Sequence, residues 1–461
     1  MPESPSINDT GRFHVPDISS VRHRRPAVAP LVRDTYALVL AGGRGTRLHE
    51  LTAWRAKPAV PFGGKHRIID FALSSCINSG IRRIGVATQY KAHSLIQHLQ
   101  RGWNFLDSHM HEFLAVLPAQ QRNRDAWYDG TADALYQNLD LMRMEEPRFV
   151  LVLAGDHVYK MDYGAMLAEH VEHGADVTVA SVEVPVDDAC AFGVLRTDTQ
   201  GWLRELVEKP ARPEPLPGDP TRARVSMGIY VFNAETLYEA LRKDASRPGS
   251  THDIARDLMP DLLRSGLRIR AHRFADSCVN MVEGRPYWRD VGTVDAYWEA
   301  NMDLARVRPE LNMYDPTWPV RTLEEDRPPA KFALDSPDAR GQTLNSLISS
   351  GCIVSGAAVI RSVLFTNCML EQGSIVEDSI VLPGVRIGRN VRLQRTIVDK
   401  YCVLPDGFSA GLDPAADEAR FRVTKRGTVL ITPEMLGQFV HEHGSGPAIA
   451  APAPHRRAAR S

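Results

Sequence analysis

The sequence predicts an α/β domain with a mostly parallel sheet, followed by a parallel β-helix. Between Tyr36 and about Asn301, short apolar runs alternate with segments whose apolar residues have helical spacing. This alternation is typical of α/β domains, in which ligands bind at the carboxyl ends of the strands. Beyond residue 340, aliphatic residues recur every six positions and glycines separate the short runs. That period is typical of stacked β-helix coils.

The amino-acid composition indicates where the boundaries between the domains lie. Many prolines between residues 302 and 340 indicate a connecting segment, and Gly, Ala, Pro and Arg dominate the C-terminal end. We therefore expect an N-terminal extension, partly disordered, over 1–33, the α/β domain over 34–305, a linker over 306–340, the β-helix over 341–440 and a disordered tail over 441–461.

Several segments of the α/β domain have clear periodicity. The runs IRRIGVATQY (81–90), FVLVLAGDHVY (149–159) and ADVTVASVEV (175–184) are predicted strands, because they are short, apolar and rich in β-branched residues. The segments AHSLIQHLQRGW (92–103) and YGAMLAEHVEHG (163–174) have the apolar spacing of amphipathic helices.

A glycine-rich turn follows the first apolar strand, in YALVLAGGRGTRL (36–48). Its glycines allow a sharp bend that brings backbone N–H groups close to a polyanion, and Arg47 adds a fork of donors for phosphate oxygens. No Gly-Lys-Ser/Thr follows, so the turn is not a P-loop, and the glycine spacing excludes a dinucleotide fingerprint. The block RAKPAVPFGG brings Lys57 near the same turn. We therefore predict a nucleoside triphosphate site.

Two aliphatic registers carry the six-residue rhythm of the second domain. One runs through Val363, Met369, Ile375, Val381, Ile387 and Leu393, and the other through Val385, Val391, Ile397 and Val403. Each coil is expected to bury these residues against the next coil, so that the stack forms its own core.

Charge and cysteine content exclude several classes of protein. The chain has 55 Lys and Arg against 56 Asp and Glu, so we expect no broad basic face for nucleic acid. Its 6 cysteines form no Cys-x-x-Cys pair, which indicates reduced residues of a cytoplasmic protein rather than a zinc site. No apolar run approaches the roughly 18 residues that span a membrane, and the first residues lack the apolar core of a signal peptide.

Two aspartates have the character of metal ligands. Asp156 follows the buried strand FVLVLAGD, where the ligand crevice of an α/β domain opens, and Asp290 lies in PYWRDVGT before a glycine. Two carboxylates together with substrate phosphates suit Mg²⁺. A helix cap is the competing interpretation, and it applies to Asp290 more than to Asp156.

Further polar residues suit a sugar phosphate and a base. Glu208 and Lys209 end the strand LRELVEKP, where the carboxylate can accept hydrogen bonds from sugar hydroxyls and the ammonium can neutralise a phosphate. Ser226 opens the strand SMGIYVF, WYDGTADA supplies Tyr128, and the Gln121 amide can read a purine edge. Taken alone, Gln121 is better explained as a loop amide whose hydrogen bonds are satisfied. Glu208 and Lys209 taken alone are weak evidence, because Glu-Lys pairs are common on surfaces.

Taken together, these motifs identify a family. In order, LAGGRGTRL, RAKPAVPFGGKHRIIDFALSSCINSGIRR, TQYKAHSL, PAQQ, WYDGTADA, AGDHVYKMDY, FGVL, EKP, SMGIYVF and PYWRDVGT resemble the bacterial glucose-1-phosphate adenylyltransferases over about residues 30–435. The resemblance implies a Rossmann-like nucleotidyltransferase domain and a left-handed β-helix. It also implies ATP and α-D-glucose 1-phosphate as substrates, Mg²⁺ as cofactor, small-molecule allosteric effectors, a homotetramer and the first committed step of glycogen biosynthesis.

The resemblance also assigns roles to residues. The catalytic residues would be Arg47, Lys57 and Asp156, and the metal would be held by Asp156 and Asp290. The nucleotide would be bound by Ala41, Gly42, Gly43, Gly45, Arg47, Lys57, Gln121, Gly130, Thr131 and Asp156. Glucose 1-phosphate would be bound by Tyr128, Gly193, Glu208, Lys209 and Ser226. Both substrates are anions whose attacking oxygen is already ionised, so we expect catalysis by positioning and charge neutralisation, without a general base.

Three alternatives compete with this interpretation. A sugar-1-phosphate nucleotidylyltransferase that uses UTP or dTTP would have the same spacings, and this alternative stays open. A regulatory subunit of the same fold without activity would be expected to have lost Arg47, Lys57 or Asp156, and all three are present. The bifunctional uridylyltransferase–acetyltransferases need a histidine in the β-helix, and residues 341–440 contain none.

The regulatory part of the resemblance is weaker than the catalytic part. Arg55, Arg67 and Lys400 stand at positions that the resemblance links to effectors, with Lys400 in place of an arginine. The best-studied members bind a sugar bisphosphate with a lysine where this chain has Trp54. We therefore expect activation by a monophosphate or a keto acid rather than by fructose 1,6-bisphosphate, and weakened inhibition by AMP.

Overall fold

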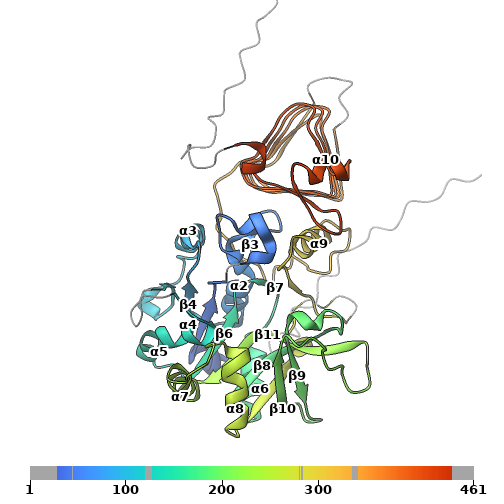
Figure 1. Ribbon diagram of the computed structural model, residues 1–461. Coiled ribbons are helices and arrows are strands. Elements are labelled where there is room, and N and C mark those ends of the chain that lie inside the picture. Colours follow the sequence, from blue (N-terminus) through green and yellow to red (C-terminus); the bar gives the residue numbers. More distant parts are fainter. Residues whose placement is uncertain are drawn as a thin grey trace, which may run out of the picture.

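An α/β unit and a β-helix pack against each other in the computed structural model (Figure 1). The structure describes residues 28–43, 45–119, 127–279, 281, 284–334 and 341–438. An α/β unit followed by a β-helix is the predicted fold class, which is thus confirmed. Most of the expected N-terminal extension and all of the expected tail lie outside the described residues. Among the described helices, none combines the length and the apolar character needed to cross a bilayer.

One sheet of nine described strands forms the centre of the α/β unit. The strands are β1 (Thr35–Leu40), β4 (Arg83–Thr88), β5 (Phe113–Pro118), β6 (Phe149–Ala154), β8 (Val177–Pro185), β9 (Gly193–Thr197), β10 (Leu203–Glu208), β11 (Arg222–Asn233) and β12 (Ile269–Arg273). Their order is β10-β9-β11-β6-β1-β4-β5, with β8 paired to β11 and β12 paired to β8. Strands β6, β1, β4 and β5 run parallel, whereas β11 is antiparallel to β6 and β8. The carboxyl ends of β1, β4 and β6 therefore meet at one edge, as predicted.

Helices cover both faces of this sheet. They are α1 (Ala29–Arg33), α2 (Ile69–Ser79), α3 (His93–Gly102), α4 (Thr131–Gln137), α5 (Leu139–Met144), α6 (Tyr163–Glu172), α7 (Ala234–Ala245) and α8 (Met259–Arg264). Helix α9 (Val294–Leu304) instead packs in the apolar cluster shared with the β-helix. Alternate residues of β1 belong to two separate cores: Ala37 and Val39 pack with α2, α3 and α6, and Tyr36 and Leu38 pack with α4, α5, α7 and α8. Burial on both faces explains why the strand is apolar throughout. The predicted strands and the two predicted helices are confirmed.

The β-helix consists of three parallel sheets that stack coil upon coil, and it has a triangular outline in Figure 1. The first sheet contains β14 (Lys331–Ala333), β17 (Ile353–Ser355), β20 (Met369–Leu370), β23 (Arg386–Ile387) and β26 (Val403–Leu404). The second contains β15 (Gln342–Leu344), β18 (Ala358–Ile360), β21 (Ile375–Glu377), β24 (Arg392–Gln394) and β27 (Ser409–Ala410). The third contains β16 (Leu347–Ile348), β19 (Val363–Leu364), β22 (Ile380–Val381), β25 (Thr396–Val398), β29 (Val429–Ile431) and β28 (Arg422–Val423).

Most residues of the two predicted aliphatic registers are buried, with three exceptions. Val403 is 39% exposed and its neighbour Leu404 is buried instead. Met369 and Ile375 are only partly buried, and their neighbours Leu370 and Val376 belong to the core. In the first sheet Met369 pairs with Arg386 and Ile387 pairs with Leu404, each 17 residues later (386 − 369 and 404 − 387). A coil of 17 residues is one residue short of three hexapeptides, so the strict six-residue period shifts by one position from coil to coil. The prediction that Met369, Ile375 and Val403 face the core is therefore wrong.

The proline-rich segment before the β-helix lies along α2. Leu311 and Trp318 are buried, and Asn78 Nδ2 of α2 donates a hydrogen bond to the Pro319 carbonyl at 2.9 Å. Strand β14 already pairs with β17 ahead of residue 341, where the sequence predicts the β-helix to begin.

A shared apolar core joins the two units. Phe62 and Tyr297 of the α/β unit pack in one cluster with Phe365, Ile380 and Leu430 of the β-helix. This contact buries one side of α9 against the coils.

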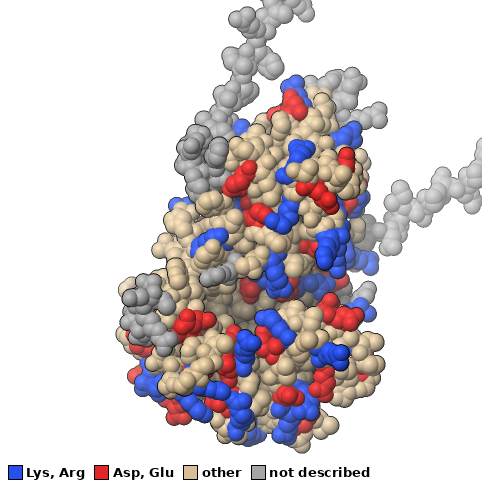
Figure 2. All heavy atoms as spheres, viewed as in Figure 1, with Lys and Arg blue, Asp and Glu red and all other residues tan. Residues whose placement is uncertain are grey.

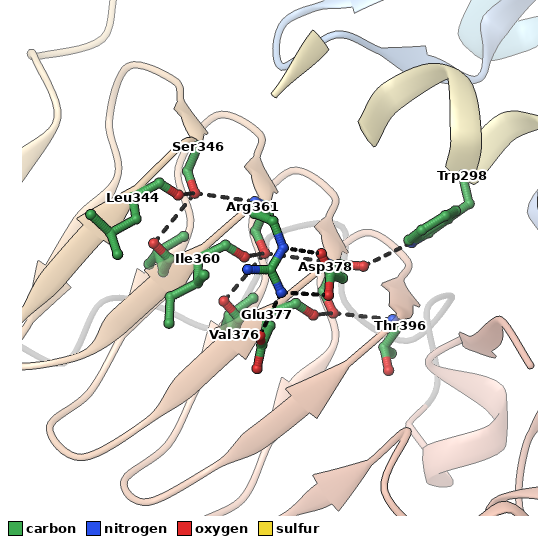
Figure 3. Close-up of polar contacts among 12 residues, drawn as sticks. Trp298, Leu344, Ser346, Ile360, Arg361, Val376, Glu377, Asp378 and Thr396 are labelled. Carbon is green, nitrogen blue, oxygen red and sulfur yellow. Dashed lines mark hydrogen bonds and ion pairs between the residues drawn. The ribbon is translucent and has the colours of Figure 1, made fainter. Parts of the chain in front are cut away.

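The corner of the coils next to α9 is rich in polar contacts (Figure 3). The Trp298 ring points at this corner, and its Nε1 donates to the Asp378 carbonyl at 2.8 Å. The Arg361 guanidinium holds the same corner through Asp378 Oδ1 at 2.7 Å and Glu377 Oε1 at 2.6 Å. The Arg395 guanidinium lies 3.9 Å from the centroid of the Trp298 ring. Helix α9 is thus fixed to successive coils.

Surface charges of both signs are interspersed on the face drawn in Figure 2. This agrees with the near-neutral composition of the chain.

Candidate active site

A cavity of 550 Å³ opens at the carboxyl ends of β1, β4 and β6. It brings together every residue predicted to bind substrates or metal, except Gln121, which lies outside the described residues. These residues are Ala41, Gly42, Gly43, Gly45, Arg47, Lys57, Tyr128, Gly130, Thr131, Asp156, Gly193, Glu208, Lys209, Ser226 and Asp290. They come from segments far apart in the sequence, so the sheet topology brings them together.

The glycine turn follows β1 at one wall of the cavity. Gly45 has φ of 62°, in the left-handed region that favours glycine. A Cβ on Gly45 would lie 3.0 Å from the Lys57 Cβ, so the turn and the lysine are in close contact. Behind the turn, a Cβ on Gly42 would lie 3.1 Å from the Cβ of Gln89, a cavity residue that the sequence analysis did not select. The turn therefore presents its backbone directly to the cavity.

Lys57 lies between the two predicted metal ligands. It belongs to the short 3₁₀ segment Lys57–Ala59 and is only 5% exposed. Its Nζ donates to Asp156 Oδ2 at 3.0 Å and to Asp290 Oδ1 at 2.7 Å. Asp290 is in β13 (Trp288–Asp290), which pairs with β7 (His157–Tyr159) directly after Asp156. This pairing holds the two carboxylates on one side of the cavity.

Mutual charge stabilises all three groups in their ionised forms. Burial lowers the pKa of Lys57, but Asp156 and Asp290 raise it more, so that its pKa lies above the usual value. Burial raises the pKa of each aspartate, but Lys57 and then His157 together lower it more, so that both pKa values lie below the usual range. At neutral pH the centre therefore contains one ammonium and two carboxylates.

The same aspartates form a candidate cation site together with His157. One ligand atom from each of Asp156, His157 and Asp290 lies within 4.8 Å of the others. The His157 Nδ1 is buried and has no hydrogen-bond partner among the described residues. Two carboxylates and a ring nitrogen fit a divalent cation. The sequence-based prediction missed His157, although its place next to Asp156 in AGDHVY is a signal that could have identified it.

The opposite wall of the cavity carries the predicted sugar-phosphate residues. Glu208 and Lys209 form an ion pair of 2.8 Å, and Lys209 is extensively exposed to the cavity and solvent. A Cβ on Gly193 would lie 2.9 Å from Glu208 Oε2, so glycine leaves room for this carboxylate. Ser226 Oγ accepts a hydrogen bond from the Gly228 amide at 3.1 Å, where β11 changes register against β8. These four residues converge from β9, β10 and β11.

The residues predicted to hold the base lie near a loop at residues 252–254. A Cβ on Gly130 would lie 2.2 Å from the His252 carbonyl oxygen, so only glycine fits there. The Thr131 hydroxyl donates to Asp253 Oδ2 at 3.1 Å and accepts from the Ile254 amide at 2.8 Å. Gly130 and Thr131 therefore have a structural reason for their identity in addition to lining the cavity. Asp253 lines it too and was not predicted.

The three residues linked to effectors meet in a second cavity of 430 Å³ between the α/β unit and the β-helix. Arg55 Nη1 and Nη2 donate to the two Asp399 carboxylate oxygens at 2.7 and 2.9 Å. Arg67 donates to the backbone carbonyls of Ala59 and Ser94 at 3.2 Å. Burial, and then the charges of Arg67 and Arg55, hold the pKa of Lys400 well below its usual value.

Trp54, where the regulatory resemblance weakens, also lines this second cavity. Its Nε1 donates to Glu434 Oε1 of the β-helix at 2.5 Å. An indole ring that donates a hydrogen bond to a carboxylate supplies no cation to the cavity.

The fold and the first cavity define a nucleotidyl transferase joined to a hexapeptide β-helix. Residues 36–307 match the family model described as nucleotidyl transferase, and residues 328–431 match the one described as GlmU-like, C-terminal hexapeptide. The second match confirms the predicted left-handed β-helix. Nucleotidyl transferases of this kind generally use divalent metals, and the donors described above fit that requirement.

Similar proteins narrow the class. Glucose-1-phosphate adenylyltransferase of Nitrosospira multiformis is 57% identical over 411 residues, which are 89% of this chain and 96% of that protein. Glucose-1-phosphate adenylyltransferase of Nitrosomonas europaea is 58% identical over 415 residues, or 90% of this chain and 96% of that protein. Glucose-1-phosphate adenylyltransferase of Methylobacillus flagellatus is 58% identical over 414 residues, which are 90% of this chain and 97% of that protein. The chain belongs to the glucose-1-phosphate adenylyltransferase family.

Proposed function

We propose that this protein transfers the adenylyl group of ATP to α-D-glucose 1-phosphate, forming ADP-glucose and diphosphate. The observation that carries the proposal is a single cavity with Arg47 and Lys57 on one wall, Glu208 and Lys209 on the other, and Asp156 between them. This arrangement suits two anionic substrates that must be held close together. The names of relatives that are 53% to 58% identical support the choice of substrates.

The reaction requires an in-line displacement at the α-phosphorus of ATP. A phosphate oxygen of glucose 1-phosphate forms the new P–O bond, and the bond to the β-phosphate oxygen breaks with its electron pair leaving on diphosphate. The attacking oxygen is already ionised at neutral pH, so no residue needs to remove a proton. The task of the protein is to position the substrates and to reduce the repulsion between them.

Arg47 and Lys57 are proposed to neutralise the triphosphate. The guanidinium of Arg47 can donate two parallel hydrogen bonds to phosphate oxygens. Lys57 remains an ammonium, because Asp156 and Asp290 hold its pKa above the usual value. A divalent cation held by the two aspartates, for which we propose Mg²⁺, supplies further positive charge when bound. Asp156 and Asp290 thus serve both Lys57 and the cation.

Glu208, Lys209 and Ser226 are proposed to orient glucose 1-phosphate. The Glu208 carboxylate can accept hydrogen bonds from sugar hydroxyls, and Lys209 can neutralise the monoester phosphate. Gly193 and Tyr128 complete the sugar side, and Gly130 and Thr131 hold the loop next to the base.

The second cavity is proposed to bind a small anionic effector. Arg67 and Lys400 offer positive charge there, and the lowered pKa of Lys400 supports a site that gains from a bound anion. We retain a monophosphate or a keto acid as the expected class, since Trp54 supplies no cation.

Assembly and location complete the proposal. The homotetramer implied by the resemblance is supported by exposed apolar side chains at the first coil, among them Phe332, Leu334 and Leu344. A cytoplasmic location is supported by the six cysteines, all of which are free thiols.

A diphosphate-release assay tests the reaction. The purified protein is mixed with glucose 1-phosphate, Mg²⁺ and ATP, UTP or dTTP in turn, and ADP-glucose is identified by mass. We expect turnover with ATP at a rate at least about tenfold above the other nucleotides. Preference for UTP or dTTP would replace the proposed nucleotide, and no turnover with any of them would contradict the proposal.

A further inference from the structure

A β-hairpin at the end of the β-helix reaches the α/β unit beside the active site. Strands β28 and β29 are antiparallel, and Leu430 pairs with Arg422. Strand β29 also continues the third sheet of the β-helix by pairing with β25. The turn is closed by the Thr424 amide, which donates to the Thr428 carbonyl at 3.0 Å. The hairpin is therefore fixed to the coils.

Arg422 of this hairpin forms a two-bond ion pair with Glu50. Its Nε donates to Glu50 Oε2 and its Nη2 donates to Oε1, each at 2.5 Å. Burial raises the pKa of Glu50, but the hydrogen bonds and charge of Arg422 lower it more, and its pKa lies below the usual value. Two parallel bonds from a planar guanidinium fix both position and orientation of the carboxylate.

Glu50 belongs to the same short segment as Arg47. This segment, η2 (Thr46–Thr52), is a 3₁₀ helix interrupted at His49, where φ is 50° and ψ is −124°. A seven-residue helix with such an interruption has little internal rigidity. The buried residues Leu48 and Leu51 fix one side of this segment to the core, and the ion pair with Arg422 fixes Glu50 on its other side.

Close packing does not hold Arg47 from behind. Beside the Glu50–Arg422 ion pair, a cavity of 470 Å³ lies between η2 and the hairpin. It is lined by Thr46, Arg47, His49, Thr293, Val294, Asp295, Arg422, Val423, Thr424 and Lys425. The Arg47 side chain is 56% exposed, and its Nη2 lies 3.3 Å from Asp290 Oδ2. The cavity leaves room for Arg47 to move away from the triphosphate wall.

The same hairpin also contacts the segment that follows Asp290. Thr424 Oγ1 donates to Asp295 Oδ1 at 2.7 Å, and Arg426 pairs with Glu299. Both acidic residues are in α9, which begins four residues after Asp290. The hairpin thus connects the Arg47 segment to the helix that follows the second aspartate.

We propose that Arg422 is a positioning residue of the triphosphate site, which holds Arg47 toward the nucleotide through Glu50. The β-helix thereby completes one wall of the active site. This inference rests on the proposed function for its substrates, but the binding of ATP tests it separately from turnover.

The main test compares Arg422→Ala with wild type. We expect the dissociation constant of ATP, measured by calorimetry without sugar phosphate, and the KM for ATP to rise about three- to tenfold. The KM for glucose 1-phosphate should stay unchanged, because Glu208, Lys209 and Ser226 lie on other strands. In an Arg47→Ala background, Arg422→Ala should add no further loss, since its effect passes through Arg47.

Three further variants serve as controls. Arg426→Ala removes an exposed ion pair of the same hairpin and should leave the ATP affinity unchanged. Arg422→Lys keeps the charge but cannot form the planar two-bond contact, so we expect a loss of ATP affinity intermediate between wild type and Arg422→Ala. If Arg422→Ala does not fold, Arg422→Lys still tests the inference. Glu50→Arg combined with Arg422→Glu should restore part of the affinity.

Several outcomes would overturn the inference. They are an unchanged ATP affinity in Arg422→Ala, an equal rise in the KM of both substrates, and a loss that adds fully to that of Arg47→Ala. A wild-type protein that binds ATP but does not react with glucose 1-phosphate would contradict the proposed function alone.

Discussion

Replacing Lys57 by Met should strengthen metal binding and at the same time lower the turnover rate. Lys57 is almost fully buried and donates hydrogen bonds to both Asp156 and Asp290. Methionine has a similar length without the charge, so the two carboxylates would face each other with no ammonium between them. A cation that binds there would no longer share the carboxylates with Lys57.

The magnitude follows from the geometry of the centre. Ligand atoms of the two aspartates lie within 4.8 Å of each other. Two unit charges at that separation repel by about 3.5 kcal/mol at an effective dielectric constant of about 20. Since the Asp156 side chain is 35% exposed, solvent screening reduces this to about 2 kcal/mol. That energy corresponds to a roughly thirtyfold change in an equilibrium constant.

Calorimetric titration with Mn²⁺, without nucleotide, measures the effect. We expect Lys57→Met to bind Mn²⁺ about ten- to thirtyfold more tightly than wild type. Its kcat should fall by about 10²- to 10³-fold, because the triphosphate loses one of its buried donors. Lys243→Met is the matched control, since Lys243 pairs with Asp261 on the outer helices and should leave both quantities unchanged.

One result would refute the reasoning. If folded Lys57→Met protein bound Mn²⁺ with unchanged or lower affinity, Lys57 and the cation would not share the two carboxylates. The lysine would then belong to the nucleotide site alone.

Three further predictions concern other parts of the molecule. Asp156→Asn should lower kcat by about 10³-fold with little change in glucose 1-phosphate binding, and near-normal turnover would contradict its assigned role. Arg55→Met should lower the free energy of unfolding in urea by about 3 kcal/mol, because it leaves the buried Asp399 carboxylate unpaired; an unchanged unfolding midpoint would contradict this. The affinity for an anionic effector, measured by titration, should fall as pH rises from neutral. The depressed pKa of Lys400 makes its protonation depend on the bound anion, and an affinity independent of pH would show that Lys400 does not take part.

Most residues of the first cavity could be predicted because they lie in compact local motifs. A glycine turn after an apolar strand, or an aspartate directly after another strand, has a physical meaning that depends on few neighbours. No local motif predicts the contacts of Gly130 and Thr131 with His252 and Asp253. Thr131 and its partner Asp253, for example, are 122 residues apart in the sequence. A period of six also predicted the β-helix, but not the 17-residue coil that turns Val403 outward.

By itself, the sequence determined the class of fold, the order of its two parts and most of the residues that line the first cavity, because these depend on local periodicity and on residue type. The tertiary structure decided which charges meet. Only the folded chain puts the Lys57 ammonium between Asp156 and Asp290, and only it joins Glu50 to Arg422, 372 residues later. Such pairings depend on how strands and coils stack in space, and side-chain electrostatics act over a few ångströms whatever the distance along the chain.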